Sequence, residues 1–493
     1  MKKLFVCLVL LVSIVLQVFA QKELFSLDDC RNMAMSNNKE LKIAHEQVKV
    51  AVSLEKAAFT HYFPTISANG AYLWNEKNIS LMKEDAYLPV YAMDINGSKN
   101  YAASWNNSWA VYNGAPVPLD ANGVPFDPQK NPEKISWKNY AYLPKDAFEM
   151  DVHNVFVGSV MMAQPLFMGG KIRELNNIAK STRKISEAKF AGELSDNMLE
   201  TDAAYWRVVS LVNKEKLAKS YVALLEKLSS DVEKSILFGV ATKSEALSVK
   251  VKLNEAQMQL LQVQDGLNLS KMLLCQLCGL PLDSDFGLVD ENIATTDMPL
   301  DNPTINIDNA VANRYEIKSL EETINIAESN RKIMVSRFMP NAALTAGYLL
   351  SNPNTYNGFS TEFAGMWQVG VVVNVPIFHF GERIHTLNAA RSIKQIAEYE
   401  LEDAKEKIRL EITQSSFKMN EVIKKSIMTK TNKDKAEENL RYATIGFDSG
   451  VVASSVVMEA QTAWLKANSE DVDARIEVKL CQLYLQKAIG NLK

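Results

Sequence analysis

Two short motifs in this sequence carry residue types that could bind a metal ion or perform redox chemistry. Cys275-Gln-Leu-Cys278 has the spacing of a thiol redox pair or of half a zinc site. His379, Glu382 and His385 recur every third residue and offer imidazole and carboxylate ligands. No phosphate-binding loop or nucleophile motif accompanies either of them. The sequence therefore predicts no enzyme activity and no cofactor unless one of these motifs forms a site.

The surroundings of the cysteine motif favour packing over chemistry. Its neighbours include Met272, Leu274 and Leu277, in a segment with helical spacing. There is no second cysteine pair and no nearby histidine. Because a free cysteine commonly behaves as a small apolar residue, we expect Cys275 and Cys278 to be buried against other helices.

The N-terminus and the charge balance restrict the class of protein. Residues 1–20 have the basic start, apolar segment and small-residue end of a secretory signal peptide, and the alternative is a membrane anchor. The chain carries 54 basic and 58 acidic residues, which gives no support for nucleic-acid binding. No later segment is long and apolar enough for a transmembrane helix. An exported protein of this kind can be soluble, surface-bound or a β-barrel.

The positions of the prolines predict very long helices. None lies between Pro165 and Pro281, and none follows Pro376. Because proline interrupts helices, we expect helices over 171–237 and 243–278, joined by a turn at Gly239. A helix of about 65 residues would span about 100 Å.

The sequence also contains an internal repeat. The segment 163–170 (AQPLFMGG) recurs as 374–381 (NVPIFHFG), at an offset of 211 residues. Each copy follows a β-type segment and precedes a proline-free segment, so each is interpreted as a joint between a strand and a helix. The counterparts of His379, Glu382 and His385 in the first copy are Met168, Lys171 and Glu174, which disfavours a metal site. The joint residues are Pro165, Gly170, Pro376 and Gly381.

Four segments alternate between apolar and other residues and are predicted to be strands: 66–74, 151–167, 342–348 and 367–375. The first two are separated by residues 76–150, which are rich in Asn, Pro and aromatic residues. These form either an elaborate loop or a small accessory subdomain. The apolar face of the strands consists mainly of Ile66, Tyr72, Trp74, Phe156, Val160, Met162, Leu344, Tyr348, Trp367, Val369, Val371 and Val373.

Four such strands cannot close a barrel alone, because unpaired edges would face lipid. The long amphipathic helices likewise need one another to bury their apolar stripes. An oligomeric tube, made partly of strands and partly of helices, satisfies both requirements.

In these features the chain resembles the TolC family of outer-membrane efflux proteins. The resemblance is carried by Phe63-Pro64 and Met339-Pro340 before two strands, by the two joints, and by the glycine turns at 239 and 450. It implies an α+β membrane protein. Three chains, a homotrimer, would form a 12-stranded β-barrel with four strands per chain, continuous with a periplasmic α-helical coiled-coil barrel.

The same resemblance implies a location and partners. The barrel would lie in outer-membrane lipid, the helical tunnel in the periplasm and the loops at the cell surface. A periplasmic adaptor (membrane fusion protein) would dock, together with an inner-membrane pump of the RND or ABC type. The expected domains are the signal peptide 1–20, a first repeat 21–281 containing the extracellular loop 76–150, a linker 282–307 and a second repeat 308–493.

Site residues follow by matching positions to the family. Val456 and Glu459 occupy positions where family members often carry pore-facing acids, so three copies of Glu459 would ring the periplasmic gate beside an apolar constriction. The alternative is an ordinary solvated or interhelical glutamate, and the tip glycines could simply cap helices. The hairpin tips expected to dock the adaptor are Gly239, Val240, Ala241, Thr242, Gly450, Val451, Val452 and Ala453.

The implied function is that of the outer-membrane channel of a tripartite efflux or type I secretion system. Such a channel passively conducts substrates to the exterior, and both small molecules and polypeptides remain possible cargo. The alternative is a surface-binding outer-membrane protein that uses the segment 76–150.

Overall fold

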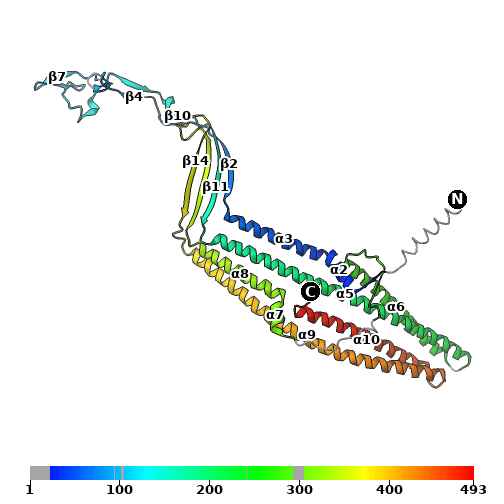
Figure 1. The fold of residues 1–493 in the computed structure, drawn as a ribbon. Helices are drawn as coiled ribbons and strands as arrows, with labels where there is room; N and C mark the ends of the chain where they lie inside the picture. Colours follow the sequence, from blue (N-terminus) through cyan, green and yellow to red (C-terminus); the bar gives the residue numbers. More distant parts are fainter. Residues whose placement is uncertain (1–22, 94, 101–104, 240, 293–304, 493) are drawn as a thin grey trace, which may run out of the picture. The chain divides into compact units, whose positions relative to one another are not determined.

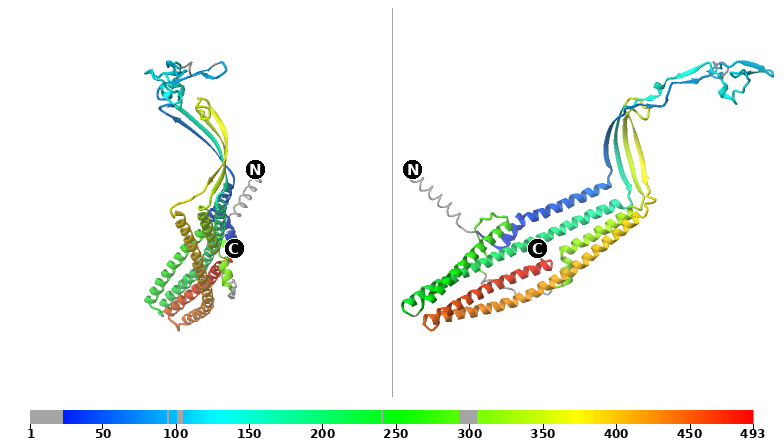
Figure 2. Two further views of the ribbon diagram at one scale, coloured as in Figure 1. Left: turned by 90° about the vertical axis from the view of Figure 1, so that its left-hand side faces the viewer. Right: turned by 180° about the vertical axis from the view of Figure 1, so that it is seen from behind.

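A computed structural model describes residues 23–492 except 94, 101–104, 240 and 293–304. The predicted signal peptide, Val240 and much of the predicted linker lie outside the described residues. The chain forms two compact units. The strand unit contains residues 62–168 and 340–375, and the helical unit contains the rest (Figures 1 and 2).

The strand unit is built on a four-stranded antiparallel sheet in the order β14-β13-β11-β2 (Figure 1). The prediction of four strands is confirmed for these segments. Their bounds are β2 (Thr65–Trp74), β11 (Asn154–Phe167), β13 (Asn341–Asn352) and β14 (Ala364–Asn374).

The register of the sheet places the predicted apolar residues on one face. Met162 lies opposite Ile66 on one side and Ala346 on the other, and Ala346 lies opposite Val369. Directly opposed residues share a face of the sheet. Ile66 and Val369 are 72% and 74% exposed. The sheet therefore presents a continuous, unburied apolar face in the single chain.

The segment between β2 and β11 is a β-ribbon (residues 76–150) with a small packed centre. Trp105 is buried, stacks on Trp109 and meets Trp137 edge to face. Of the two alternatives from the sequence, the ordered subdomain describes the ribbon better. Its paired strands are β3 (Ile79–Ser80) with β10 (Glu149–Met150), β4 (Ala86–Pro89) with β9 (Tyr140–Leu143), β5 (Ala92–Met93) with β6 (Lys99–Asn100), and β7 (Trp109–Tyr112) with β8 (Ala115–Pro118).

The helical unit is dominated by two long hairpins. Helices α5 (Lys171–Leu237) and α9 (Glu382–Asp448) each contain 67 residues. They return as α6 (Lys243–Cys278) and α10 (Ser454–Ala488). The first hairpin has the bounds predicted from the sequence. Helix α10 also packs against α5, so the two hairpins lie side by side.

Shorter helices pack against α5, α6 and α9 of the hairpins. They are α2 (Leu27–Asn37) and α3 (Lys39–Phe59) in the first half, and α7 (Ile307–Asn313) and α8 (Tyr315–Ser336) in the second. None of the described helices combines the length and the apolar character needed to span a membrane.

Each of these pairs is interrupted by a single residue that is not helical. Asn38 leaves the helical conformation, and its side chain accepts hydrogen bonds from the amides of Glu40 and Leu41. Arg314 makes the corresponding break, 276 residues later. Its buried guanidinium donates to Glu316 and Glu411 and to the carbonyls that end α10. Local capping accounts for the break at Asn38, whereas the break at Arg314 is held by bonds of the guanidinium to α9 and to the end of α10.

Each hairpin ends close to one of these breaks. Gly279, which ends α6, leaves no room for a Cβ against Asn37. Gly490, after α10, is less crowded, and an added Cβ would lie 3.3 Å from the Cβ of Asn313. Both glycines have left-handed backbone angles, with φ near +73°. A side chain at Gly279 would separate the hairpin from the short helices, and one at Gly490 would be disfavoured mainly by the backbone angle.

The cysteine motif is buried in the helical core, as the sequence predicted. Cys275 and Cys278 pack with Cys30, Tyr205 and Phe286. The Cys278 thiol lies 3.7 Å from the carbonyl oxygen of Cys30, and burial raises the pKa of the Cys275 thiol. These cysteines are free thiols that fill space between α2 and α6.

A buried ion pair fixes α2 to α5. Asp202 is fully buried and accepts two hydrogen bonds from the Arg31 guanidinium, one of them 2.7 Å long from Nε. This contact with Asp202 also raises the pKa of Arg31. A bidentate pair of this kind is geometrically specific, and either partner left alone would be a desolvated charge.

Replacement of Asp202 by alanine should lower the free energy of unfolding by about 3 kcal/mol, because Arg31 would lose its buried partner. Denaturation of the purified protein, followed by circular dichroism, measures the change. Glu46→Ala is the matched control, since Glu46 pairs with Lys49 in solvent. Equal effects of the two substitutions would contradict this role of the pair.

Candidate functional site

The two hairpin turns lie at the same end of the helical unit (Figure 2). Gly239 and Gly450 have φ values of +71° and +72°, and each ends a long helix in the left-handed conformation. A Cβ at either position would meet open space, so the backbone angle alone requires glycine. Just above the turns, Val232 and Val249 of one hairpin pack with Ala443 and Val457 of the other.

The tips expose apolar side chains. Leu237 and Phe238 are 85% and 82% exposed, and Val451 is 82% exposed. Thr242, by contrast, forms a capping box with Glu245 and so has a structural role in starting α6. Sequence reasoning missed Leu237 and Phe238. The sequence signal that could have revealed them is a pair of apolar residues directly before the turn glycine Gly239. The last turn of a helix that ends in water usually carries polar residues.

Val456 and Glu459 lie on the exposed face of α10, one turn after the second tip. Val457 and Ala460 point into the core between the hairpins. Within the described part of the chain, no ion pair or hydrogen bond involves the Glu459 carboxylate. Within the described residues, this carboxylate is therefore open to solvent and to passing ions.

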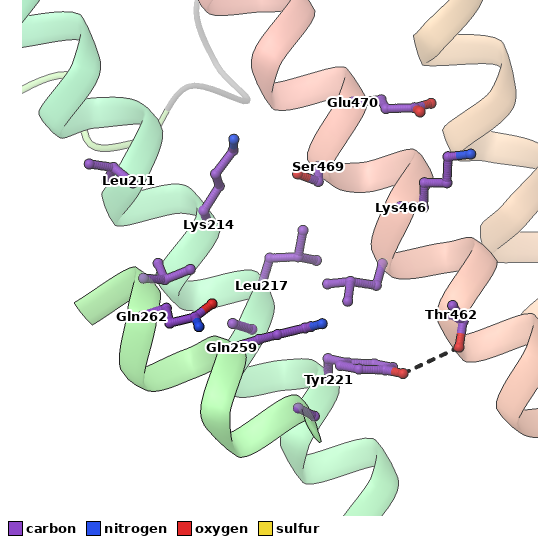
Figure 3. A pocket seen from close by; sticks show the side chains of 14 residues that line it. Leu211, Lys214, Leu217, Tyr221, Gln259, Gln262, Thr462, Lys466, Ser469 and Glu470 are labelled. Carbon is purple, nitrogen blue, oxygen red and sulfur yellow. Dashed lines mark hydrogen bonds between the residues drawn. The ribbon is translucent and has the colours of Figure 1, made fainter. Parts of the chain in front are cut away.

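A cavity of about 560 Å³ opens on the same side of α10 (Figure 3). Lys466 and Glu470 line it, and they follow Glu459 by seven and eleven residues. Residues at these spacings share one face of an α-helix. The cavity and Glu459 therefore belong to one continuous surface.

The cavity floor is formed by the first hairpin. Leu217 and Tyr221 of α5 point toward α10, and the Tyr221 hydroxyl lies 3.3 Å from Oγ1 of Thr462 (Figure 3). Lys214 at the rim is paired with Asp473 of α10. The surface thus combines apolar walls with a few charged groups, which suits transient contact with varied molecules.

The two joint motifs share their helix starts but not their strand ends. Gly170 and Gly381 both precede their helices with φ of +87°. Pro165 lies within β11, which continues to Phe167 past an irregular register. Pro376 lies beyond the end of β14, contrary to the expectation of two equivalent joints. The partner strand β13 begins at Asn341, opposite Asn374, so no ladder remains for Pro376 to join.

The histidine motif has an ordinary structural partner. Nδ1 of His379 lies 2.8 Å from the Arg383 guanidinium, which also donates to the carbonyl of Pro376. Among the residues that the structure describes, no group of His, Cys, Asp or Glu is arranged to hold a metal ion.

Part of the chain is similar to a known protein family. Residues 306–491 match the family model "Outer membrane efflux protein". No curated protein matches the sequence significantly.

Several solved outer-membrane proteins share the fold. The outer membrane protein VceC of Vibrio cholerae has a TM-score of 0.68 at 16% identity, over 94% of this chain and 96% of its own. The CmeC outer membrane channel of Campylobacter jejuni gives 0.68 at 15% identity, over 94% and 85%. The open state of the MtrE outer membrane channel of Neisseria gonorrhoeae gives 0.63 at 14% identity, over 95% and 89%.

These solved structures cover nearly the whole chain, and the family model covers much of the second half. The first long hairpin and the four strands expected from the sequence are present in the structure. Residues 306–491 are therefore similar to the outer membrane efflux protein family, and the chain shares the fold of solved outer-membrane proteins.

Proposed function

We propose that this protein is the outer-membrane channel of a tripartite export system and passively conducts substrates to the cell exterior. The observation that carries the proposal is the antiparallel sheet with one exposed apolar face and two outer strands. Within the described chain, β2 and β14 each pair on one side only. Such edges cannot face lipid unpaired.

A homotrimer satisfies these edges. Successive strands of the sheet alternate in direction, so β14 of one copy can pair antiparallel with β2 of the next. Three copies then give a closed barrel of 12 strands. The match of residues 306–491 to the outer membrane efflux protein family supports this assembly. The side-by-side hairpins would continue it as a helical tunnel in the periplasm.

The apolar face would contact outer-membrane lipid. Its aromatic residues gather toward the ends of the strands that lead to the loops. The rings of Tyr72 and Phe156 are 4.8 Å apart, and those of Tyr348 and Trp367 are 5.2 Å apart. Such clusters suit a membrane interface, where one end of the side chain is apolar and the other is wet. The ribbon 76–150 would then project at the cell surface.

The exposed face of α10 would line the conduit. Three copies of Glu459 would form a carboxylate ring above an apolar constriction of Val456 side chains. A ring of carboxylates disfavours anions and binds cations. The cavity of Figure 3 would open to the same conduit, because it shares this helix face.

The hairpin tips would dock the periplasmic adaptor, which links the channel to an inner-membrane pump of the RND or ABC type. Exposed apolar side chains at Leu237, Phe238 and Val451 support this role, since such groups at a helix end need a partner to cover them. The predicted tip residues Gly239, Ala241 and Val452 shape the turns that present them.

We also propose that the two halves of the chain, 21–281 and 308–493, are copies of one structural unit. Equal lengths of α5 and α9 support this, as do the breaks at Asn38 and Arg314. The matching approaches of Gly279 and Gly490 to asparagine side chains support it independently. Residues 1–20 would direct export and be removed.

Spin labels introduced at Val371 and Val372 should report different environments. The two side chains are 58% and 57% exposed in the single chain and point to opposite faces of β14. In reconstituted protein, the label at 371 should be accessible to oxygen in lipid, and that at 372 to a water-soluble nickel complex. The opposite accessibilities would show that the apolar face lines the lumen.

Replacement of Glu459 by glutamine should reduce cation selectivity and cation block of the channel in planar bilayers, because the carboxylate ring loses its charge. Glu459→Asp retains the charge and should retain both properties. Unchanged conductance, selectivity and block in the glutamine variant would eliminate Glu459 as a gate residue.

Replacement of Phe238 by aspartate should abolish export in cells while single-channel conductance persists, because a charge at the tip opposes apolar docking. Sensitivity of a complemented deletion strain to dyes and detergents tests small-molecule efflux, and failure to secrete a protein tests polypeptide export. Glu226→Ala on the exposed side of α5 serves as control. Full export by the aspartate variant would contradict docking through this residue.

A further inference from the structure

The β-ribbon contains a polar cavity that the channel function does not use. It has a volume of about 650 Å³. It lies between the segment that follows Trp105, the turn at Asp120 and the segment before β9. The polar residues that line it include Asn106, Asn107, Ser108, Asp120, Asn122, Glu133, Lys134 and Ser136.

The cavity walls are held by side chains that are fully engaged. The Asn107 amide donates to the carbonyls of Leu119 and Lys134, and its oxygen accepts from the amide of Ser136 at 2.6 Å. Asp120 caps its own turn and pairs with Lys134 at 3.2 Å. The framework of the cavity is therefore built before any ligand arrives.

Other polar side chains in the lining do not take part in this hydrogen-bonded framework. Within the described chain, no hydrogen bond involves the side chains of Asn106, Ser108 or Asn122. Amides and hydroxyls both donate and accept hydrogen bonds. They therefore suit a ligand that offers many hydroxyl groups.

A row of exposed tyrosines leads away from the cavity. Tyr140 lines the cavity, and Tyr142 lies two residues further on the same face of β9. Tyr87 lies opposite Tyr142 on β4, with the ring centroids 5.3 Å apart. The three side chains are at least half exposed. Their rings thus form an exposed aromatic platform on one face of the ribbon, in which the planes of Tyr87 and Tyr142 are tilted by 40°.

The platform is fixed by hydrogen bonds at its base. The Tyr142 hydroxyl donates to Asp85 at 2.9 Å, and the same carboxylate accepts from the amide of Lys145. The Lys145 amide and then Tyr142 hold the pKa of Asp85 below its ordinary value. A platform of this kind loses little conformational freedom when a ligand stacks on it.

The charge of the ribbon restricts the ligand further. Residues 76–150 contain nine acidic and seven basic side chains, of mixed sign along the segment. A strongly charged polymer would meet as much repulsion as attraction here.

We propose that the ribbon binds a neutral carbohydrate chain, with hydroxyl groups in the cavity and sugar faces stacked on the tyrosine row. Hydroxyls match the uncommitted amides and Ser108, and the C–H faces of sugars match aromatic rings. This binding function lies outside the proposed channel function, and either can fail without the other.

Isothermal titration calorimetry with the purified full-length protein in detergent tests the proposal. The probes are neutral hexasaccharides of glucose, galactose, mannose or N-acetylglucosamine, and a sulfated hexasaccharide is the charged comparison. At least one neutral probe should bind with a Kd of about 1 mM or tighter. Tyr140→Ala should weaken that binding about tenfold and Tyr140→Phe should largely retain it, because the ring is kept.

Tyr112→Ala is the matched control, since this tyrosine is 63% exposed on β7 but does not line the cavity. Asn122→Ala should weaken binding without altering the circular dichroism spectrum. Failure of every neutral hexasaccharide to bind would overturn the proposal, as would preferential binding of the sulfated probe. Equal losses of sugar affinity in the Tyr112→Ala and Tyr140→Ala variants would also overturn it. Self-association of the protein through the ribbon would do the same. Single-channel conductance of the same variants should stay unchanged, which separates this site from the conduit.

Discussion

The backbone hydrogen bonds at the two edges of the four-stranded sheet are the constraint on which the rest of this molecule depends. A single chain pairs β2 and β14 on one side only. Their outer amides and carbonyls need partners wherever water is excluded. The large side chains on one face add a second demand, since an apolar surface of this extent needs cover. In the proposed trimer, further copies of the same chain would meet both demands, so oligomer formation would be part of folding.

The helical unit solves a related problem by different means. Each of its long helices packs against more than one neighbouring helix. A few specific contacts fix the helices to one another. They are the buried Arg31–Asp202 pair, the packed thiols around Cys278, and the bonds of the Arg314 guanidinium to the end of α10. These points lie near the short helices, far along the chain from the tips. The tips are held mainly by small apolar contacts such as those of Val457 and Ala460.

Much of this architecture could be predicted from the sequence, because proline and glycine mark it so clearly. The bounds of α5 and α6 follow from Gly170, Gly239 and Gly279, and the strand faces follow from simple alternation. The breaks at Asn38 and Arg314 could not be predicted in this way. An asparagine or arginine within a helical pattern signals nothing until its capping partners are known. The ribbon was equally difficult to predict, since its short ladders depend on pairings across many residues.

The candidate site was predicted unevenly for a related reason. Matching the two halves located the turns and Glu459, but position alone did not reveal which tip side chains protrude. The high exposure of the Leu237 and Phe238 side chains in the structure identified them as accessible, although the comparison of the two halves had not selected them. The glycines that this comparison did select shape the turns. Sequence correspondence located the turns, and the structure showed which atoms a partner could reach.

The equal length of α5 and α9 has a consequence for how such a protein can change. Each helix contains 67 residues, or about 100 Å at the usual rise. One residue inserted in either helix would turn its tip by about 100° and misalign it with its neighbour. Acceptable changes must therefore add or remove whole heptads, in both hairpins and in both arms of each. In the proposed tunnel, the reach of the hairpins could therefore change only in steps of a whole heptad.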